Sequence, residues 1–331
     1  MTIQTVTVFG ASGFIGRHVV QRLAAKGLQI RAATRHPEDA LFLKPMGDVG
    51  QITPVQANIR DAASVSAAVA GADAVINLVG ILYARGRQSF EAVQVDGVRH
   101  IAEAAAAAGA SRFVQMSALG ADAASASAYA RSKAAGEAAA REAFPATVIL
   151  RPSVVFGPQD DFFNRFADMA RLSPVLPVFG CPMPRLRDGR IDIYGAGGTR
   201  FQPVYVGDVA EAVVRSLGDV GASGGVYELG GPTVYSFVEL MRLILREIDR
   251  RRLIVPVPFW MAEFIAAFAE WLPVPPLTRD QLTLLKRDNV ITGAHPTLSD
   301  LGIEPTAAEA VLPSYLDIYR RGGRFNQAHW A

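Results

Sequence analysis

A tyrosine and a lysine four residues apart offer acid–base chemistry. The segment reads Tyr129-Ala130-Arg131-Ser132-Lys133, and on a helix this spacing places the phenol and the ammonium on one face. A lysine cation beside a phenol favours the phenolate, so the pattern predicts that Lys133 lowers the pKa of Tyr129 toward that of a general acid/base. The same lysine can hold the ribose of a nucleotide. The spacing alone is a weak pattern, and its value depends on a nucleotide site elsewhere in the chain.

Three glycines near the N-terminus predict such a site. Gly10, Gly13 and Gly16 follow an apolar run at residues 6–9, and a helical apolar pattern begins at Ile15. In a strand–turn–helix, the first glycine permits the tight turn, the second admits a pyrophosphate, and the third lets the helix pack closely on the strand. The helix N-terminus then favours the phosphate charge. The alternative is an ordinary glycine-rich turn that binds nothing.

The residues after the second expected strand bear on the choice between NAD and NADP. An NAD site uses an acid there to hold the ribose 2′-hydroxyl, but residues 32–37 contain no acid and the first carboxylate is Glu38. Arg35 stands where a guanidinium can bind a 2′-phosphate, and Arg17 opens the first helix beside it. Two cations without a carboxylate predict NADPH. The alternative is that Arg35 only solvates a loop.

Two further stretches fall at strand ends that face a nucleotide in such a fold. Asn58 and Ile59 follow the third expected strand, where an amide and an apolar side chain can bracket adenine. The alternative for Asn58 is capping of the next helix together with Asp61. Val79 and Gly80 end the fourth expected strand, where the backbone must run close to the cofactor.

The elements that position these residues alternate between strand and helix over the first ~150 residues, which predicts a parallel sheet covered on both faces. The expected strands are Thr5–Phe9, Gln29–Ala33, Gln51–Gln56, Ala74–Val79, Arg112–Met116 and Thr147–Leu150. The expected helices are Ile15–Lys26, Ala62–Ala70, Phe90–Ala108 and Ala130–Ala143. The predicted fold class is therefore α/β, a doubly wound parallel (Rossmann) sheet, with residues 1–150 as the nucleotide-binding domain.

After Leu150 the composition shifts toward proline, glycine and aromatic residues, which predicts a smaller α/β lobe over 151–331. A segment at about 201–217 is expected to return to the sheet. The elements expected here are strands at Arg190–Tyr194, Phe201–Val206, Gly225–Leu229 and Leu253–Val257, with helices at Asp208–Val213, Ser236–Ile248 and Phe259–Trp271. Asp160 and Asp161 are expected to sit in a loop or cap a helix at Phe162–Met169.

The whole-chain composition narrows the classes of function. The formal net charge is +2, so no nucleic-acid footprint shows in the bulk balance. The single cysteine, Cys181, excludes an internal disulfide, and the five histidines lack metal-ligand spacing, so no metal site is expected. No uncharged apolar run approaches the ~18 residues of a membrane span. The few residues before the first strand leave no room for a signal or transit peptide, which predicts a cytoplasmic or already trimmed protein.

At this point the chain resembles the short-chain dehydrogenases/reductases of the extended and atypical kind. The likeness runs from the glycine turn through Tyr129 and Lys133 to Arg151–Pro158 and Gln202–Ala210, so it covers most of the chain. Within that family it is similar to the nucleotide-binding accessory subunits of respiratory complex I and their bacterial relatives. This narrower likeness rests on Gly10–Arg17, Asn77–Gly80, Ser117–Ala121, Tyr129–Lys133 and Phe162–Phe166.

The resemblance implies a tightly held NADPH, other subunits of a membrane electron-transfer complex as partners, possible contact with the membrane surface, and no established turnover. It implies a peripheral location on the cytoplasmic face of a bacterial inner membrane, or on the mitochondrial matrix side for a trimmed eukaryotic chain. It also implies the cofactor contacts, which are Gly10, Ser12, Gly13, Phe14, Ile15, Gly16, Arg17, Arg35, Asn58, Ile59, Val79, Gly80, Ser117, Tyr129, Lys133, Pro152 and Val154.

One departure from the family pattern concerns catalysis. Active members carry a serine or threonine just after the fifth strand, beside the tyrosine, but here that position falls on Ala118 and Ser117 stands one residue early. A shift of one residue at a strand end turns a side chain to the opposite face. With Ala118 in register the substrate loses a hydrogen-bond donor, a loss that costs about 2.7–4 kcal/mol in oxyanion-type sites. Ser117 in register restores Tyr129, Lys133 and Ser117 as a catalytic set.

Two hypotheses follow from these residues. The first is an NADPH-binding accessory subunit without turnover, in which Tyr129 and Lys133 remain only as cofactor ligands. The second is a soluble NAD(P)-dependent reductase, epimerase or dehydratase that uses Tyr129 as acid/base with Lys133 assisting.

Three segments bear on partners. The aromatic face of Phe259–Trp271 is expected to pack into the core of the second lobe, and the alternative is a surface for another subunit or a membrane interface. Arg250-Arg251-Arg252 is expected to be a solvated helix end, and the alternative is contact with an acidic partner or anionic headgroups. The tail at 320–331 is expected to be a docking extension.

Overall fold

The computed structural model describes residues 3–181, 185–187, 190–218, 224–272, 275 and 277–323. Its internal contacts divide the chain into two units, each built from several segments. The first contains Met1–Pro152, Val206–Leu229 and Thr292–Glu304, and the second contains Ser153–Tyr205, Gly230–Ile291 and Pro305–Ala331.

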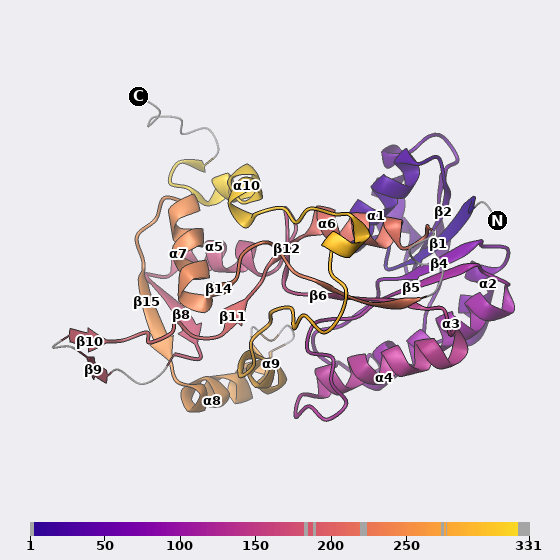
Figure 1. Ribbon diagram of the computed structural model, residues 1–331. Helices are drawn as coiled ribbons and strands as arrows, with labels where there is room; N and C mark the ends of the chain where they lie inside the picture. The colour runs from indigo at the N-terminus through magenta and orange to yellow at the C-terminus, as the bar shows by residue number, and fades with distance from the viewer. Residues whose placement is uncertain are drawn as a thin grey trace. The chain divides into compact units, whose positions relative to one another are not determined.

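The first unit is built on a seven-stranded parallel sheet, in the order β13-β6-β5-β4-β1-β2-β3 (Figure 1). Its strands are β1 Thr5–Phe9, β2 Gln29–Thr34, β3 Ile52–Gln56, β4 Ala74–Asn77, β5 Arg112–Met116, β6 Val148–Pro152 and β13 Gly225–Leu229. The order runs in opposite directions on the two sides of β1, so a crevice opens at the carboxyl ends of β1 and β4. The predicted doubly wound α/β fold is confirmed.

Helices cover both faces of this sheet because each buries one apolar stripe against it. Helices α1 (Phe14–Ala25) and α6 (Val206–Arg215) lie on one face (Figure 1). The other face carries α2 (Ala62–Val69), α3 (Gly97–Ala107) and α4 (Ala128–Ala143). The helix predicted over residues 90–108 is present, but it contains one π-helical turn, Ala92–Asp96.

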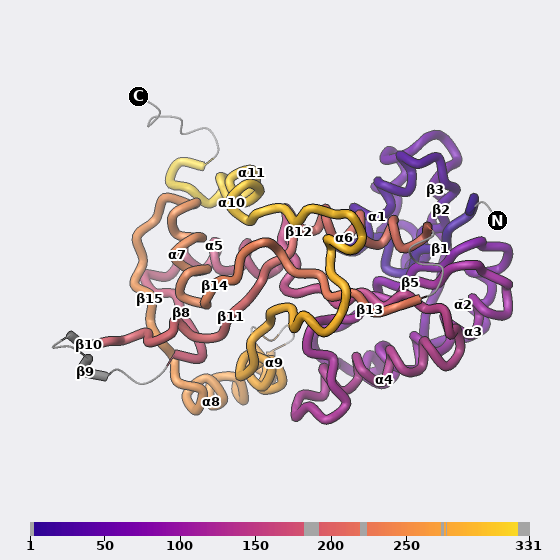
Figure 2. Tube along the Cα trace, viewed as in Figure 1, coloured from indigo at the N-terminus to yellow at the C-terminus, as the bar shows by residue number. Residues whose placement is uncertain are grey.

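The sequence places residues 1–150 and a return at about 201–217 in this unit, whereas the internal contacts of the structure assign three segments to it. The returning segment is Val206–Leu229, which supplies α6 and the edge strand β13. Thr292–Glu304 also returns, and in Figure 2 it passes beside α6. There the Arg215 Nη1 donates to the carbonyl oxygens of Leu301 and Gly302 at 2.8 and 2.9 Å.

The second unit is a mixed α/β structure with several small sheets. Its strands are β7 Val155–Phe156, β8 Val175–Phe179, β9 Arg185–Arg187, β10 Arg190–Asp192, β11 Arg200–Phe201, β12 Val204–Tyr205, β14 Tyr235–Ser236 and β15 Leu253–Val257. Its helices are α5 Phe163–Leu172, α7 Phe237–Glu247, α8 Phe259–Ala269, α9 Arg279–Leu285, α10 Ala308–Val311 and α11 Pro313–Leu316. The strand expected at 201–206 is two short strands, because the chain bends at Gln202-Pro203 and enters α6 at Val206.

Aromatic packing and one buried carboxylate hold the core of this unit. The rings of Phe162 and Phe237 lie 6.0 Å apart, and both lie within 6.0 Å of the Phe201 ring. Asp160 caps α5, as the sequence predicts: its Oδ1 accepts the N–H of Phe163 at 2.5 Å, and its Oδ2 accepts the Tyr315 hydroxyl at 2.6 Å. These bonds satisfy a carboxyl group that is 3% exposed.

Helix α8 contradicts the expectation that its aromatic face packs into the core. Trp260, Phe264 and Phe268 are 70%, 65% and 66% exposed, and Trp271 just beyond the helix is 90% exposed. The buried side is a narrow row of small residues, Ala262, Ala266 and Ala269. The small alanine side chains let α8 pack closely on the rest of the second unit. The bulky aromatic residues face solvent on the opposite side of the helix.

Candidate nucleotide-binding site

The glycine turn between β1 and α1 brings three backbone segments into close approach. Gly10 has a φ of +78°, and a Cβ there would lie 3.2 Å from the carbonyl carbon of Leu78 and 3.2 Å from the nitrogen of Val79. A Cβ on Gly16 would lie 2.2 Å from the Gly10 oxygen. Gly13 is the residue before α1 and has no side chain to cap the helix. The turn therefore leaves a helix N-terminus accessible to an anion.

A cleft of about 290 Å³ opens beside this turn, at the carboxyl ends of β1, β2, β3 and β4. Eight of the predicted cofactor contacts line it: Gly10, Ser12, Gly13, Arg35, Asn58, Ile59, Val79 and Gly80. The rest of the lining, which no sequence motif predicted, consists of Phe9, Ala33, Thr34, Ala57, Arg60, Leu78, Ile81, Gln88 and Val93. Of the other predicted contacts, Phe14, Ile15, Gly16 and Arg17 form the first turn of α1, outside this lining.

The cations of the cleft differ from those expected. Arg35 is exposed and lines the cleft at the end of β2. Arg17 instead contacts the turn itself: its Nη2 donates to the Ser12 carbonyl at 3.4 Å, and its guanidinium lies 4.9 Å from the Phe42 ring centre. Arg60, which the sequence analysis missed, lines the cleft and donates to the Arg87 carbonyl at 3.2 Å. Its place directly after Asn58-Ile59 was the available signal.

Asn58 lines the cleft but does not cap the next helix. Its side chain lines the cleft, and its Oδ1 accepts the N–H of Arg60 at 3.2 Å. Asp61, not Asn58, caps α2, because its Oδ1 accepts the N–H groups of Ala63 and Ser64. Asn58 therefore shapes the loop that carries Ile59 and Arg60.

A buried amide pair shapes the backbone at the end of β4. Asn77 is fully buried; its Nδ2 donates to the Gln115 Oε1 at 2.9 Å, and its Oδ1 accepts the Val79 N–H at 3.0 Å. Gln115 in turn donates to the Met116 carbonyl at 2.8 Å. This network holds the chain at Val79-Gly80 against the glycine turn, where the cleft needs it.

Tyr129 and Lys133 lie on one face of α4 as predicted, but the predicted effect on the tyrosine is wrong. Burial raises the pKa of Tyr129 to about 12, and the Lys133 Nζ lies 5.8 Å from the tyrosine ring centre. Burial also lowers the pKa of Lys133 to about 8, against an opposing effect of the Glu137 carboxylate. The Lys133 Nζ donates to the Met116 carbonyl at 3.4 Å. Desolvation therefore outweighs the lysine charge at the phenol.

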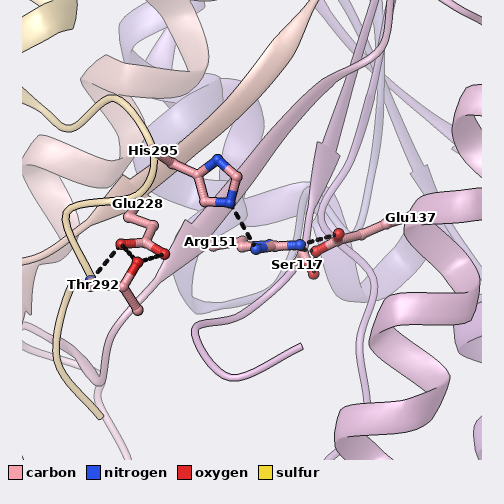
Figure 3. A network of polar contacts seen from close by, with 6 residues as sticks. All are labelled: Ser117, Glu137, Arg151, Glu228, Thr292 and His295. Atoms are coloured by element: carbon pink, nitrogen blue, oxygen red, sulfur yellow. Dashed lines mark hydrogen bonds and ion pairs between the residues drawn. The ribbon is translucent and has the colours of Figure 1, made fainter. Parts of the chain in front are cut away.

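Ser117 is engaged in a buried polar network (Figure 3). Its hydroxyl donates to the Glu137 Oε1 at 2.5 Å, and Glu137 accepts two bonds from Arg151 at 2.8 and 2.6 Å. The Arg151 Nη1 lies 3.4 Å from the His295 Nε2. Nearby, Glu228 accepts the Thr292 N–H at 2.6 Å and the Thr292 hydroxyl at 2.9 Å. Ser117 thus points toward Glu137 and Arg151, and none of these residues lines the cleft.

The π-helical turn before α3 also supports the cleft, and no sequence signal marked it. Gln94 in that turn donates to the Ile81 carbonyl at 2.6 Å, and its Oε1 accepts the Ser132 hydroxyl at 2.8 Å. Single π-helical turns are frequent at functional sites.

The last two predicted contacts belong to different units: Pro152 ends β6 in the first unit, and Val154 lies in the second.

The lining of the cleft suits the adenosine and pyrophosphate parts of a dinucleotide. Gly13 leaves the N-terminus of α1 uncapped for a pyrophosphate, and Ile59 with Asn58 provides an apolar and an amide surface for a base. Arg35 and Arg60 place positive charge at the same cleft. Fold and site together define a dinucleotide-binding protein of the Rossmann class.

Comparison with known proteins places the chain more narrowly. The chain belongs to the NAD dependent epimerase/dehydratase family, whose sequence profile matches residues 6–230. It is 37% identical to NADH dehydrogenase [ubiquinone] 1 alpha subcomplex subunit 9, mitochondrial, of Arabidopsis thaliana, over 96% of this chain and 78% of that protein. It is 32% identical to the NADH-ubiquinone oxidoreductase 40 kDa subunit, mitochondrial, of Neurospora crassa, over 97% of this chain and 81% of the other.

Solved structures agree on the fold. The dTDP-glucose 4,6-dehydratase DesIV from Streptomyces venezuelae, solved with NAD and TYD bound, superimposes with a TM-score of 0.71. The alignment covers 99% of both chains at 20% sequence identity. At this identity the likeness extends to the fold, so the function has to be argued from the site and the relatives.

Proposed function

We propose that this chain is a nucleotide-binding accessory subunit of respiratory complex I that holds NADPH without turning it over. The observation that carries the proposal is its similarity, over nearly its full length, to proteins named as subunits of NADH dehydrogenase [ubiquinone] in Arabidopsis thaliana and Neurospora crassa. By this proposal its partners are other subunits of the complex. Its location is peripheral, at the cytoplasmic face of a bacterial inner membrane or at the equivalent mitochondrial matrix side.

The cations of the cleft support NADPH as the nucleotide. Arg35 lies at the end of β2, where an acid would select NAD, and no carboxylate is found among the described residues that line the cleft. Ser12 and Gly13 would lie against the pyrophosphate, and Asn58 and Ile59 against the adenine. Lys133 and Tyr129 would hold the nicotinamide ribose. When bound, NADPH supplies a hydride donor.

The state of the acid–base residues supports retention without turnover. With its pKa raised to about 12, the Tyr129 phenol holds its proton at neutral pH. The Ser117 hydroxyl donates to Glu137, so it is committed to a structural hydrogen bond. By this proposal Ala118 occupies the position of the family's serine, and no hydroxyl there polarises a carbonyl substrate.

The exposed aromatic face of α8 supports assembly with other proteins. Trp260, Phe264, Phe268 and Trp271 form the broad apolar surface described above. Both glutamates of this segment form ion pairs: Glu263, within α8, pairs with Lys286 at 2.8 Å, and Glu270, directly after α8, pairs with Arg279 at 3.0 Å. Their negative charges are therefore compensated. Aromatic surfaces without net charge are typical of the centres of protein–protein interfaces. Among the described residues, no helix is long and apolar enough to cross a bilayer.

The test is native purification from membranes with a tag on the N-terminus. We expect the chain to be recovered with a large membrane assembly and with bound NADPH, measured by its fluorescence. The NADPH should stay reduced when carbonyl compounds or nucleotide sugars are added. Recovery only as a free soluble species would overturn the subunit assignment. Substrate-dependent oxidation of NADPH that Tyr129→Phe abolishes would instead establish the reductase, epimerase or dehydratase alternative.

A further inference from the structure

Arginines from three separate segments of the second unit gather at one of its ends. They come from the last turn of α5, from the link between α7 and β15, and from the stretch after α11. They are Arg171, Arg250, Arg251, Arg252, Arg320 and Arg321. We call these six residues the arginine cluster.

Hydrogen bonds to backbone carbonyls fix the position of three of these side chains. The Arg252 Nε donates to the Ala170 carbonyl at 2.8 Å, beside Arg171. The Arg250 Nε donates to the Tyr319 carbonyl at 2.9 Å, and the Arg320 Nε donates to the Glu247 carbonyl at 2.8 Å. These contacts tie the three segments together, so the cluster is part of the fold. They also place cations at the C-terminal ends of α5 and α7, where the helix dipoles favour them.

The arginines are close enough to repel one another. Desolvation, followed by repulsion from Arg252, Arg321 and Arg171, lowers the pKa of Arg250. The carboxylates of these segments do not balance the charge. Asp168 pairs with Arg171 at 3.3 Å and Glu247 with Arg246 at 3.3 Å. Asp249 and Asp317 bring the carboxylates of these segments to four. They face seven arginines, namely the six of the cluster and Arg246.

Exposed aliphatic side chains belong to the same three segments as these cations. Leu172 and Leu253 are 83% and 64% exposed, and Ile318 is 50% exposed. Leu172 follows Arg171 and Leu253 follows Arg252 in the sequence, and the Leu253 N–H donates to the Pro174 carbonyl at 3.0 Å. The three segments that carry the arginine cluster therefore also expose large aliphatic groups.

This combination matches an anionic bilayer surface better than an acidic protein. A lipid surface offers phosphate charge to the arginines and an acyl boundary to the leucines. An acidic protein surface would satisfy the arginines and leave the leucines opposite polar groups. The aromatic face of α8 lies elsewhere: β15 runs from Leu253 beside the cluster to Val257, and α8 begins beyond that far end (Figure 1).

We propose that the arginine cluster, with Leu172, Leu253 and Ile318, binds the anionic phospholipid headgroups of a membrane. The arginines contact the phosphates, and the aliphatic side chains enter the boundary between headgroups and acyl chains. This inference rests on the proposed function, which places the chain at the periphery of a membrane. It adds the surface that contacts the membrane and the class of lipid that this surface binds.

The test is co-sedimentation of the full chain with vesicles of phosphatidylcholine alone and with vesicles that also contain phosphatidylglycerol. We expect binding only to the vesicles with phosphatidylglycerol, and weaker binding as salt rises. Arg251→Glu/Arg321→Glu should weaken that binding by ~10-fold or more, since each cation near an anionic surface contributes about 1 kcal/mol. Leu172→Ser/Leu253→Ser should weaken it without changing its salt dependence.

The matched control is Lys44→Glu/Arg141→Glu, which makes the same change in net charge on exposed residues of the first unit. It should bind the anionic vesicles like the unaltered chain, and circular dichroism should show every variant folded. Equal loss in the control, equal binding to neutral vesicles, or no binding to either vesicle would overturn the proposal. Retention on immobilised polyglutamate without binding to vesicles would assign the cluster to an acidic protein. None of these results decides whether the chain is a subunit of the complex, because co-purification with the complex tests that proposal separately.

Discussion

Ser117 and Lys133 illustrate how the surroundings of a residue decide its chemistry. Both have the residue type that a short-chain dehydrogenase/reductase site needs. Ser117, however, donates to the Glu137 carboxylate at 2.5 Å, and Lys133 is only 7% exposed, with a pKa lowered to about 8 by burial. The sequence shows which groups are present, but desolvation depends on the packing of β5, α4 and β6 around them.

The selection of the nucleotide by Arg35 can be tested by reversing its charge. Arg35→Asp should weaken NADPH binding by ~10- to 100-fold, because a charge-assisted contact to phosphate contributes about 1.5–3 kcal/mol. NADH binding should change by less than ~3-fold, since it has no 2′-phosphate. Isothermal titration calorimetry with both nucleotides measures the difference. Arg141→Asp, an equal charge change on α4, is the control, and equal losses for both nucleotides would remove Arg35 from the site.

The buried lysine predicts a dependence of stability on pH. The pKa of Lys133 is 10.5 unfolded and about 8 folded, so between these values the unfolded chain holds more protons and the free energy of unfolding rises with pH. Below pH 8 the charge is buried at a constant cost, on the order of 3 kcal/mol. Lys133→Met removes that cost. In the nucleotide-free chain, its stability advantage should be largest below pH 8 and should decline toward pH 10.5.

Urea unfolding of both proteins across this pH range measures the effect, and the comparison cancels groups common to both. An advantage that stays constant with pH would show that Lys133 keeps its ordinary pKa in the folded chain.

At the scale of the element, apolar periodicity predicts where a helix lies in the sequence better than it predicts which side of the helix is buried. Helix α7 has one apolar side, and Leu240, Leu243 and Ile244 of that side are buried as its pattern predicts. Helix α8 is apolar on most of its circumference, so its pattern does not say which side faces inward. The structure buries Ala262, Ala266 and Ala269 and exposes the aromatic residues. Side-chain size decided the orientation, and a sequence alone does not show the width of the space available.

The exposure of α8 predicts that its aromatic residues matter for assembly and little for folding. Trp260→Ser/Phe264→Ser should leave the free energy of unfolding within about 0.5 kcal/mol, as is usual for exposed sites. Recovery with the membrane assembly should fall several-fold, because large aromatic residues contribute most to interfaces. Leu41→Ser/Val49→Ser, at 52% and 108% exposure in the first unit, is the control. Unchanged co-purification would exclude α8 from the interface.

At the scale of the whole molecule, the nucleotide unit is not a continuous domain. The sequence predicts the positions of strands β1 to β6 along the chain well, because short apolar runs alternate with helices in this part. It does not predict that Thr292–Glu304 joins the same unit, since that segment has no helix or strand pattern and is held by single hydrogen bonds, such as Arg215 to Leu301. The three hydrogen bonds between Glu228 and Thr292 likewise link residues 64 positions apart.

This organisation predicts that a fragment ending at Pro152 does not fold alone. It would lack β13, which pairs with β6 from Gly225–Val148 to Leu229–Pro152, and α6, which packs on α1. An unpaired strand edge and an uncovered apolar face favour aggregation. Thermal unfolding followed by near-ultraviolet circular dichroism should show no cooperative transition for the fragment. A cooperative transition together with full NADPH affinity would contradict this account.

The return of Thr292–Glu304 to the first unit has a consequence for synthesis. A ribosome delivers the glycine turn and β1 first, yet the unit that contains them gains its last segment only after residue 304 has emerged. Any translation stop between Glu228 and Thr292 leaves a buried carboxylate without its two donors. Since such groups are costly to bury unpaired, the unit that carries the glycine turn is fully stabilised only after the late part of the message has been translated.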